Sequence, residues 1–182
     1  MAANPADEAL ALVTPRLALR PFRLDDFDDL HAMDGDERVM RYIGPGLPGR
    51  TREQTTEALA RMVTYAAAHP GYGLLHASRH DGGSFVGGCG LYPLPESDAA
   101  DIEIAYRLRH DCWGHGYATE MASAVLEHGF ATLKLARIVG VTHPDNLPSQ
   151  RVLGKIGMRA EGTAVHFGRR MCVFSAAHKP NA

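Results

Sequence analysis

The sequence predicts a mixed α/β domain in which helices flank one central mixed sheet. Two apolar runs, Leu74 to Arg79 and Phe85 to Tyr92, are joined by Asp81-Gly82-Gly83, which is a typical hairpin signal. In the second half of the chain, helical patterns alternate with short strands, as they do in βα units. Because the 182 residues contain no repeat and no linker, we expect a single domain, 14–182, after a flexible tail, 1–13.

The charge balance argues against several classes of partner. Lys and Arg number 19 and Asp and Glu number 21, which gives a formal net charge of −2. A general nucleic-acid or membrane-surface binder draws its affinity from excess positive charge, so neither partner is expected. No apolar run approaches the ~20 residues that span a bilayer. A signal peptide begins with basic residues, and here no basic residue precedes Arg16, so no signal peptide is expected. Cys89, Cys112 and Cys172 are widely spaced and predict free thiols in a cytoplasmic protein.

In the first half of the chain, local signals place a strand and two helices ahead of the hairpin. Residues 16–22 alternate as a half-buried strand does, and the acidic pair at 25–26 is typical of a helix start. Thr51 and Gln54 form a capping-box pattern that opens the second helix. Between the two helices, 44–49 is rich in Gly and Pro and predicts a loop, which is either idle or a lid over a substrate.

A third strand is expected from Asp101 to Arg109, after a second loop at 93–100. Its side chains alternate between two faces, with Ile102, Ile104, Tyr106 and Leu108 on one and Glu103, Ala105 and Arg107 on the other. The tyrosines at 106 and 117 have apolar neighbours, so we expect both to pack rather than to do chemistry.

The remaining elements alternate between helix and strand. A helix is expected from Ala118 to about Lys134, followed by a β-branched strand from Arg137 to Thr142. Asn146 caps the next helix, because its side chain can accept hydrogen bonds from backbone N–H groups two or three residues on. Two short closing strands are expected at 158–161 and 171–176.

The turn before the long second-half helix is the most informative segment, and its sequence is Trp113-Gly114-His115-Gly116-Tyr117-Ala118. Glycines let backbone N–H groups approach an anion, and the helix points its positive end at the same place. A dinucleotide motif would need a third glycine where Thr119 stands, and the Gly-Lys-Ser/Thr of a P-loop is absent. The turn therefore predicts diphosphate binding, or else glycines with a purely steric role.

Four motifs, in order and at the right spacing, resemble the GNAT superfamily of N-acetyltransferases and, within it, the RimJ/RimL-like branch. They are Thr14-Pro15-Arg16-Leu17-Ala18-Leu19-Arg20, the strand Ile102 to Leu108, the segment Trp113 to Glu120, and Asn146 to Leu153 followed by Lys155-Ile156-Gly157-Met158. The match runs from about Val13 to the final strand. Superfamily motifs usually have Gln or Arg where Trp113 stands, but tryptophan is common there in this branch.

The resemblance implies a mostly antiparallel central mixed sheet with splayed strands, helices on both faces, and acetyl-CoA as the co-substrate. It assigns pyrophosphate binding to backbone N–H groups of Trp113, Gly114, His115, Gly116, Tyr117, Ala118 and Thr119. The strand edge at Tyr106, Arg107 and Leu108 would pair with the pantetheine arm as if the arm were another strand. Asn146 would also contact that arm, and Arg151 would reach the phosphates.

The family positions also imply roles in acetyl transfer to a primary amine. Glu103 would deprotonate the ammonium as a general base, and Ser149 would donate a proton to the leaving thiolate. The alternatives are a solvated carboxylate for Glu103, a capping role for Ser149 and a solvated helix face for Arg151. The acceptor is either a protein N-terminus or a small-molecule amine. Transfer is expected to be direct, in a ternary complex, with Cys89 and Cys112 as rival acyl carriers.

Further expectations concern metals, partners and an alternative function. None of the ten histidines pairs with Cys or acidic residues at a metal-ligand spacing, so no metal is assigned. His76 and His80 would share a strand face by accident of surface placement. Homodimers are frequent in the resembling branch, which makes a second copy of the chain a candidate partner. The alternative function is a non-catalytic module of the same fold that binds or senses acetyl-CoA.

Overall fold

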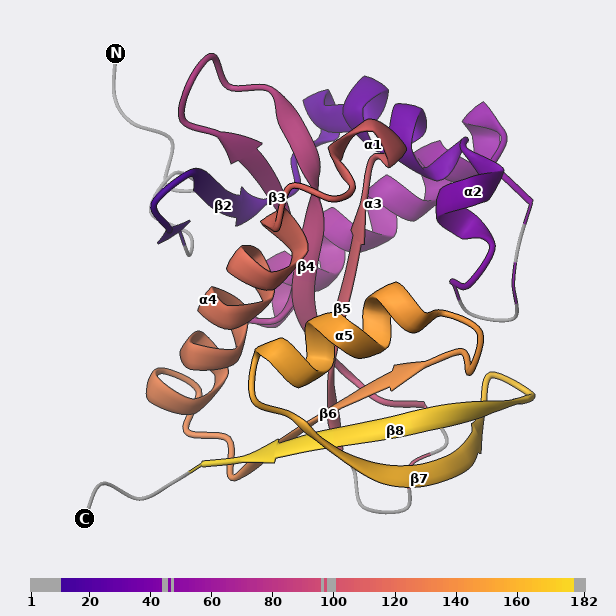
Figure 1. Cartoon of the computed structure of the whole chain (residues 1–182). Helices are drawn as coiled ribbons and strands as arrows, with labels where there is room; N and C mark the ends of the chain where they lie inside the picture. The colour runs from indigo at the N-terminus through magenta and orange to yellow at the C-terminus, as the bar shows by residue number, and fades with distance from the viewer. Residues whose placement is uncertain (1–10, 44–45, 47, 96, 98–100, 179–182) are drawn as a thin grey trace.

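The computed structural model describes residues 11–43, 46, 48–95, 97 and 101–178. An eight-stranded sheet forms its centre (Figure 1), with the strand order β1-β2-β3-β4-β5-β6-β8-β7. The strands are β1 (Leu12–Val13), β2 (Leu17–Pro21), β3 (Gly73–Arg79), β4 (Phe85–Pro93), β5 (Ile102–Leu108), β6 (Arg137–Thr142), β7 (Arg159–His166) and β8 (Arg169–Ala177). Neighbouring strands are antiparallel except for β5 and β6, which are parallel.

Helices cover both faces of this sheet, which confirms the predicted fold class. They are the 3₁₀ helices η2 (Leu24–Asp26) and η3 (His110–Cys112), with α1 (Phe27–Asp34), α2 (Glu37–Met40), α3 (Arg52–Ala68), α4 (Tyr117–Ala131) and α5 (Leu147–Lys155). In Figure 1, α4 and α5 lie in front of the sheet, whereas α1 and α3 lie behind it. No helix in the described ranges is both long enough and apolar enough to cross a membrane.

Each face has its own apolar core. Met121 of α4 and Leu153 of α5 are fully buried against the sheet in the larger core. Leu30 of α1 and Leu59 of α3 are buried in a second core on the opposite face. The sheet is therefore covered on both faces, and the side chains of β5 are buried or only partly exposed.

Several local predictions are confirmed by hydrogen bonds. The Thr51 hydroxyl accepts from the backbone N–H of Gln54, whose side chain accepts from the backbone N–H of Thr51, so the capping box is complete. Asn146 caps α5 by accepting from the backbone N–H of Ser149. The hairpin between β3 and β4 turns at the predicted place, with Gly82 and Gly83 both at positive φ.

Three elements differ from the sequence-based expectation. Leu12 and Val13 form β1 and pair with β2, so the tail is shorter than 1–13, and residues 1–10 lie outside the described part. α2 was not foreseen, because four residues are too few to show a helical period. The closing strands β7 and β8 are longer than expected. The length of β7 could not be predicted, because its side chains are almost all exposed and show no alternation of buried and exposed positions. Of the two expected loops, residues 44, 45, 47, 96 and 98–100 also lie outside the described ranges.

A row of basic side chains crosses the sheet beneath α1. Strand register aligns Arg20 of β2, His76 of β3 and Arg107 of β5 on the face that α1 covers. The acidic groups opposite them come from η2 and α1, with Asp26 bound to Arg20 and Asp34 bound to Arg107. Helix α1 is therefore held to the sheet by ion pairs as well as by apolar contacts.

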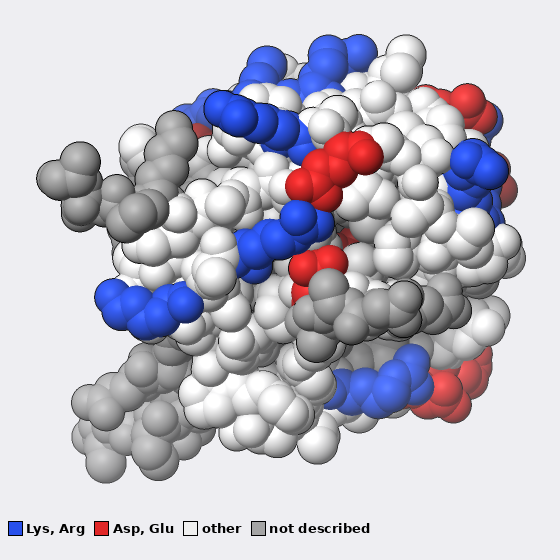
Figure 2. Space-filling view, turned by 90° about the horizontal axis from the view of Figure 1, so that it is seen from below, with Lys and Arg blue, Asp and Glu red and all other residues white. Residues whose placement is uncertain are grey.

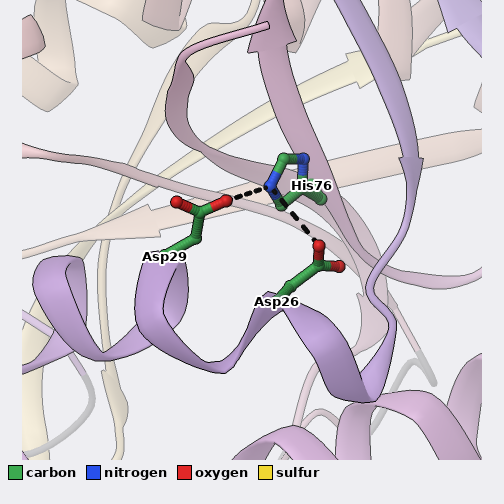
Figure 3. Close-up of side chains that lie close together, drawn as sticks. All are labelled: Asp26, Asp29 and His76. Carbon is green, nitrogen blue, oxygen red and sulfur yellow. Dashed lines mark hydrogen bonds and ion pairs between the residues drawn. The ribbon is translucent and has the colours of Figure 1, made fainter.

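His76 lies in this row beside two carboxylates (Figure 3). Its Nε2 is 2.9 Å from Oδ2 of Asp29 and 3.9 Å from Oδ1 of Asp26. His76 is 3% exposed, so the expectation of a surface histidine is wrong, because α1 covers this part of β3. These groups have the chemistry of a cation site, but both oxygens of Asp26 accept from the Arg20 guanidinium at 2.7 Å. The cluster is thus explained as an ion-pair network that holds α1.

Asp34 makes the most deeply buried contact of the row. Its side chain is fully buried and accepts from Nε and Nη2 of Arg107 at 2.7 and 3.0 Å. Nη1 of Arg50 binds the same carboxylate at 2.6 Å, and the backbone N–H of Arg50 donates to the Asp34 carbonyl. One carboxylate therefore joins the end of α1, the strand β5 and the segment that leads into α3.

We expect Asp34→Ala to destabilise the fold by about 3–5 kcal/mol, because it leaves two largely buried guanidinium groups without their carboxylate. Urea unfolding followed by circular dichroism measures this loss. Asp81→Ala is the matched control, because it breaks an Arg–Asp pair at the exposed hairpin, and its unfolding curve should stay close to wild type. Equal unfolding midpoints for the two variants would show that the Asp34 contact does not stabilise the fold.

Candidate active site

The strands β5 and β6 diverge after a single pair. β5 is paired with β4 along its whole length, from Ile102 to Leu108, but the register with β6 holds one partner pair, Glu103 and Val139. Figure 1 shows the two strands running in different directions from that point. The edge of β5 beyond Glu103, at 106–108, therefore lies where the sheet is open. Backbone groups at such an edge are able to pair with an extended ligand.

The predicted anion-binding turn lies at the end of β5 and opens α4. Gly114 and Gly116 both have φ of +81°, a conformation that favours glycine. Gly116 is the N-cap of α4 and offers no side-chain oxygen to the first N–H groups of the helix, which include those of Ala118 and Thr119. The indole Nε1 of Trp113 donates to the Leu108 carbonyl at 3.1 Å and closes the loop from β5. These features fit a diphosphate held by backbone N–H groups.

Tyr106 of β5 and Ser149 of α5 are joined by hydrogen bonds. The Tyr106 hydroxyl lies 3.0 Å from Ser149 Oγ and 3.0 Å from the Ser149 carbonyl oxygen, to which it donates. Burial raises the pKa of Tyr106, so its hydroxyl keeps its proton. Tyr106 packs as expected, but its polar contact with Ser149 was not predicted from the sequence. The sequence did contain one indication of this contact. The Tyr106 hydroxyl is a polar group on a face that it shares with Ile102, Ile104 and Leu108.

Glu103 lies on the other face of β5 and is mostly buried. Burial raises the pKa of its carboxyl to about 7, against which a hydrogen bond from the Val141 backbone N–H acts weakly. In the part of the chain that the structure describes, its carboxylate takes part in no ion pair. The side chain of Glu103 is only partly exposed, because helices α1 and α3 cover this face of the sheet. A carboxyl that titrates near neutral pH is suited to proton transfer.

The other expected site residues are placed as follows. The side chain of Arg107 is bound to Asp34, so only its backbone is available at the edge of β5. Asn146 adjoins Ser149 at the start of α5, and Arg151 is exposed one turn further along that helix. Tyr117 is buried at the start of α4, and the His115 ring stacks on it. The structure thus brings Tyr106, Asn146 and Ser149 together, with Glu103 across the sheet.

The two cysteines that compete as acyl carriers are poorly suited to nucleophilic attack. Cys89 is fully buried, and burial raises the pKa of its thiol far above neutral. Cys112 lines a pocket of about 270 Å³ with Arg109 and His115, on the side of the turn next to the β3–β4 hairpin. Partial burial and the neighbouring Asp111 raise its pKa as well. Both thiols are therefore protonated at neutral pH.

Comparison with known proteins identifies the family. Residues 16–159 match the family model described as an acetyltransferase (GNAT) domain. The uncharacterized N-acetyltransferase YnaD of Bacillus subtilis is 30% identical over 151 residues, which cover 83% of this chain and 84% of YnaD. A GNAT-family acetyltransferase from Bacillus anthracis has a similar structure, with a TM-score of 0.77, 27% identity, and coverage of 92% of this chain and 98% of that one.

A further structural likeness concerns RimJ of Mycobacterium smegmatis, which was solved in complex with CoA-disulfide. It has a TM-score of 0.74 and 21% identity, and the alignment covers 92% of this chain and 86% of RimJ. At that identity the likeness shows the fold alone. The family model covers most of the chain, and the fold matches that of the GNAT-family acetyltransferase from Bacillus anthracis. The chain belongs to the GNAT family and is an acetyl-CoA-dependent N-acetyltransferase.

Proposed function

We propose that this protein transfers the acetyl group of acetyl-CoA directly to a primary amine, with Glu103 as the general base. The observation that carries the proposal is the mostly buried Glu103 carboxyl, whose pKa is about 7 and which has no cation beside it among the described residues. An alkylammonium is almost fully protonated at neutral pH and must lose a proton before it attacks. A carboxylate of raised basicity in a site that lacks its own cation is suited to both binding and deprotonating such a group.

The proposed base and the proposed proton donor lie on opposite faces of β5. Glu103 projects to the face of α1 and α3, whereas Tyr106 and the Ser149 pair lie on the face of α4 and α5. A thioester held in the opening between β5 and β6 would have the base on one side and the proton donor on the other. That arrangement supports attack from one face and departure of the thiolate toward the other, without a covalent acyl-enzyme.

Acetyl-CoA supplies the activated acetyl group, and the chain supplies its binding groups. We assign the pantetheine arm to the backbone edge at Tyr106, Arg107 and Leu108, and to Asn146. We assign the pyrophosphate to the N–H groups of the turn at 113–119, and a phosphate contact to Arg151. The open edge of β5 and the N-cap glycine of α4 support these assignments.

Ser149 is the proposed proton donor to the thiolate, and Tyr106 holds it in place. Tyr106 donates to the Ser149 carbonyl and contacts Ser149 Oγ, so the serine hydroxyl is kept on the side of the open strand edge. Asn146 fixes the backbone N–H of the same residue as the helix cap. The capping role and the proton-donating role are therefore compatible, because the cap uses the backbone of Ser149 and not its hydroxyl.

The acceptor is a primary amine, carried either by a protein N-terminus or by a small molecule, and the reaction takes place in the cytoplasm. The three described cysteines are free thiols, which supports a reducing compartment.

We expect Glu103→Gln to lower kcat/KM by about 10²–10⁴-fold and to remove a pH dependence centred near 7. In the wild type, kcat/KM should fall as pH drops through about 7, because the base becomes protonated. Thiol release from acetyl-CoA with a panel of amines and N-terminal peptides measures this profile. Glu127→Gln, on the exposed side of α4, is the control and should keep the wild-type profile. A Glu103→Gln profile identical to wild type would exclude Glu103 as the base.

The same substitution should stabilise the fold above pH 7. The folded pKa of Glu103 is raised above its ordinary value of 4.5, so ionisation weakens the fold as pH rises from about 4.5 to 7. Glutamine removes that penalty and still accepts from the Val141 backbone N–H, for a gain of roughly 1–3 kcal/mol at pH 8. Urea unfolding of both proteins at pH 5 and pH 8 measures the difference, which should be much smaller at pH 5.

We expect Ser149→Ala to lower kcat by roughly 10–100-fold while CoA affinity changes little, because the variant keeps the helix cap and loses the proton donor. Tyr106→Phe should give a smaller loss in kcat, because the serine remains. Steady-state kinetics and calorimetry with CoA separate the two effects. Ser123→Ala removes an exposed serine hydroxyl on α4 and serves as the matched control. An unchanged kcat in Ser149→Ala would remove that residue from the mechanism.

A further inference from the structure

Two motifs about 100 residues apart meet at the start of α4. The Glu120 carboxylate accepts from the Thr14 hydroxyl at 2.6 Å and from the backbone N–H of Arg16 at 2.8 Å, both through Oε1. Its Oε2 accepts from Nε of Arg16 at 2.6 Å and lies 2.6 Å from Nη2. The Glu120 side chain is 14% exposed and that of Arg16 is 49% exposed. Both carboxylate oxygens are therefore used to hold the segment 14–16 against the first turn of α4.

Arg16 also contacts the turn itself. Its Nη1 donates to the His115 carbonyl at 3.0 Å, and its guanidinium lies 4.6 Å from the centre of the Tyr117 ring. Nη2 lies 3.5 Å from the position that a Cβ on Gly116 would occupy. One side chain thus contacts the residues on both sides of Gly116, at the place where the turn becomes a helix.

The contact with His115 fixes the direction of a backbone N–H. The peptide between His115 and Gly116 is planar and trans, so its carbonyl and its N–H point in opposite directions. Because Arg16 holds the carbonyl, the N–H of Gly116 points away from the guanidinium. In Figure 1 the start of α4 lies between β2, which follows Arg16, and β5, whose far edge is open. Arg16 directly precedes β2, so its guanidinium reaches the His115 carbonyl from the start of that strand.

The ion pair also settles the charge at this helix end. An unpaired Glu120 in the first turn of α4 would repel a diphosphate, because both carry negative charge. Arg16 cancels that charge, and Glu120 in turn occupies the guanidinium, so Arg16 is not a free phosphate ligand. The diphosphate is left to the backbone N–H groups and the helix dipole.

We propose that Arg16 is a positioning residue for acetyl-CoA, which orients the turn at 113–119 and neutralises Glu120 without touching the substrate. This rests on the proposed function, in which that turn binds the pyrophosphate. The Thr14-Pro15-Arg16 motif and the turn therefore act together. The motif supplies the hydrogen-bond donors, and the acceptors are Glu120 and the His115 carbonyl.

The test compares two acetyl donors in the full-length chain. Acetyl-CoA carries the diphosphate, and S-acetylpantetheine carries the same thioester and pantetheine arm without it. We expect Arg16→Ala to raise the Kd of CoA, and to lower kcat/KM for acetyl-CoA, by roughly 10–100-fold. With S-acetylpantetheine, kcat/KM should change less than about threefold, because no diphosphate is present to be misplaced.

Arg79→Ala is the matched control. Arg79 is also paired with an aspartate, is exposed to a similar extent and lines the pocket next to His115 and Tyr117, but the structure records no hydrogen bond from it to the turn. Its loss removes the same charge from the same side of the turn, so CoA affinity should change by less than about threefold. In Arg16→Ala/Glu120→Gln the repulsion is gone but the His115 carbonyl is still unheld, so CoA affinity should recover only in part.

The outcomes separate this inference from the function on which it rests. If wild-type protein binds CoA but Arg16→Ala binds it equally well, the positioning role is wrong and the proposed function stands. An equal loss in Arg79→Ala, or an equal loss with both acetyl donors, would also overturn it, because charge alone or general damage would then explain the effect. If wild type binds CoA but acetylates no amine on the panel, the proposed acceptor class fails while the CoA affinities still decide the role of Arg16. Absence of CoA binding by wild type would overturn both.

Discussion

The divergence of β5 from β6 is the constraint on which the site depends. A strand that leaves its neighbour loses half of its ladder hydrogen bonds and must be held by other contacts. Here side chains on both faces hold it. Arg107 is bound to the buried Asp34 of α1 on one face, and Tyr106 is bound to Ser149 of α5 on the other. The Trp113 indole then fixes the Leu108 carbonyl at the end of the strand. The backbone edge at 106–108 therefore stays unpaired with β6, because these contacts hold the same residues in place without a second neighbouring strand.

Features that depend on neighbours in the chain were predictable from the sequence. The capping box at Thr51, the Asn146 cap and the glycine turn at the β3–β4 hairpin all follow from residue chemistry over four positions or fewer. The contact between Asp34 and Arg107 spans 73 residues, and no local pattern encodes it. His76 was misplaced for the same reason, since the helix that covers it lies far away in the sequence. The strand β7 was predicted only as far as residue 161, because its residues are almost all exposed and follow no alternation.

The site shows the same division between local and distant information. Alternation along β5 correctly separated Glu103 from Tyr106. It could not say which face meets water, because helices cover both faces and the side chains at the odd positions are only partly exposed. The pKa of Glu103 and the contact between Tyr106 and Ser149 both arise from that double covering. The turn at Gly116 was found from sequence because its glycines are a local requirement. The guanidinium behind it was not, because it comes from the other end of the domain.

Many charged side chains of this protein are paired with a side chain of opposite charge. Arg16 is paired with Glu120, Arg20 with Asp26, and Arg137 with both Asp101 and Glu161. On the face that Figure 2 shows, blue and red side chains are interspersed and form no continuous patch of one sign. The net charge of −2 therefore belongs to a protein in which many positive and negative side chains form ion pairs with one another.

Against this background the mostly buried Glu103 is an exception, because burial works against its ionised form and no cation in the described ranges offsets that cost. A carboxylate left unpaired in this way weakens the fold at neutral pH unless a cation arrives from outside the chain. An ammonium group that approaches the open edge of β5 is such a cation. In the proposed mechanism, the same physical fact would account both for the binding of an amine and for its deprotonation.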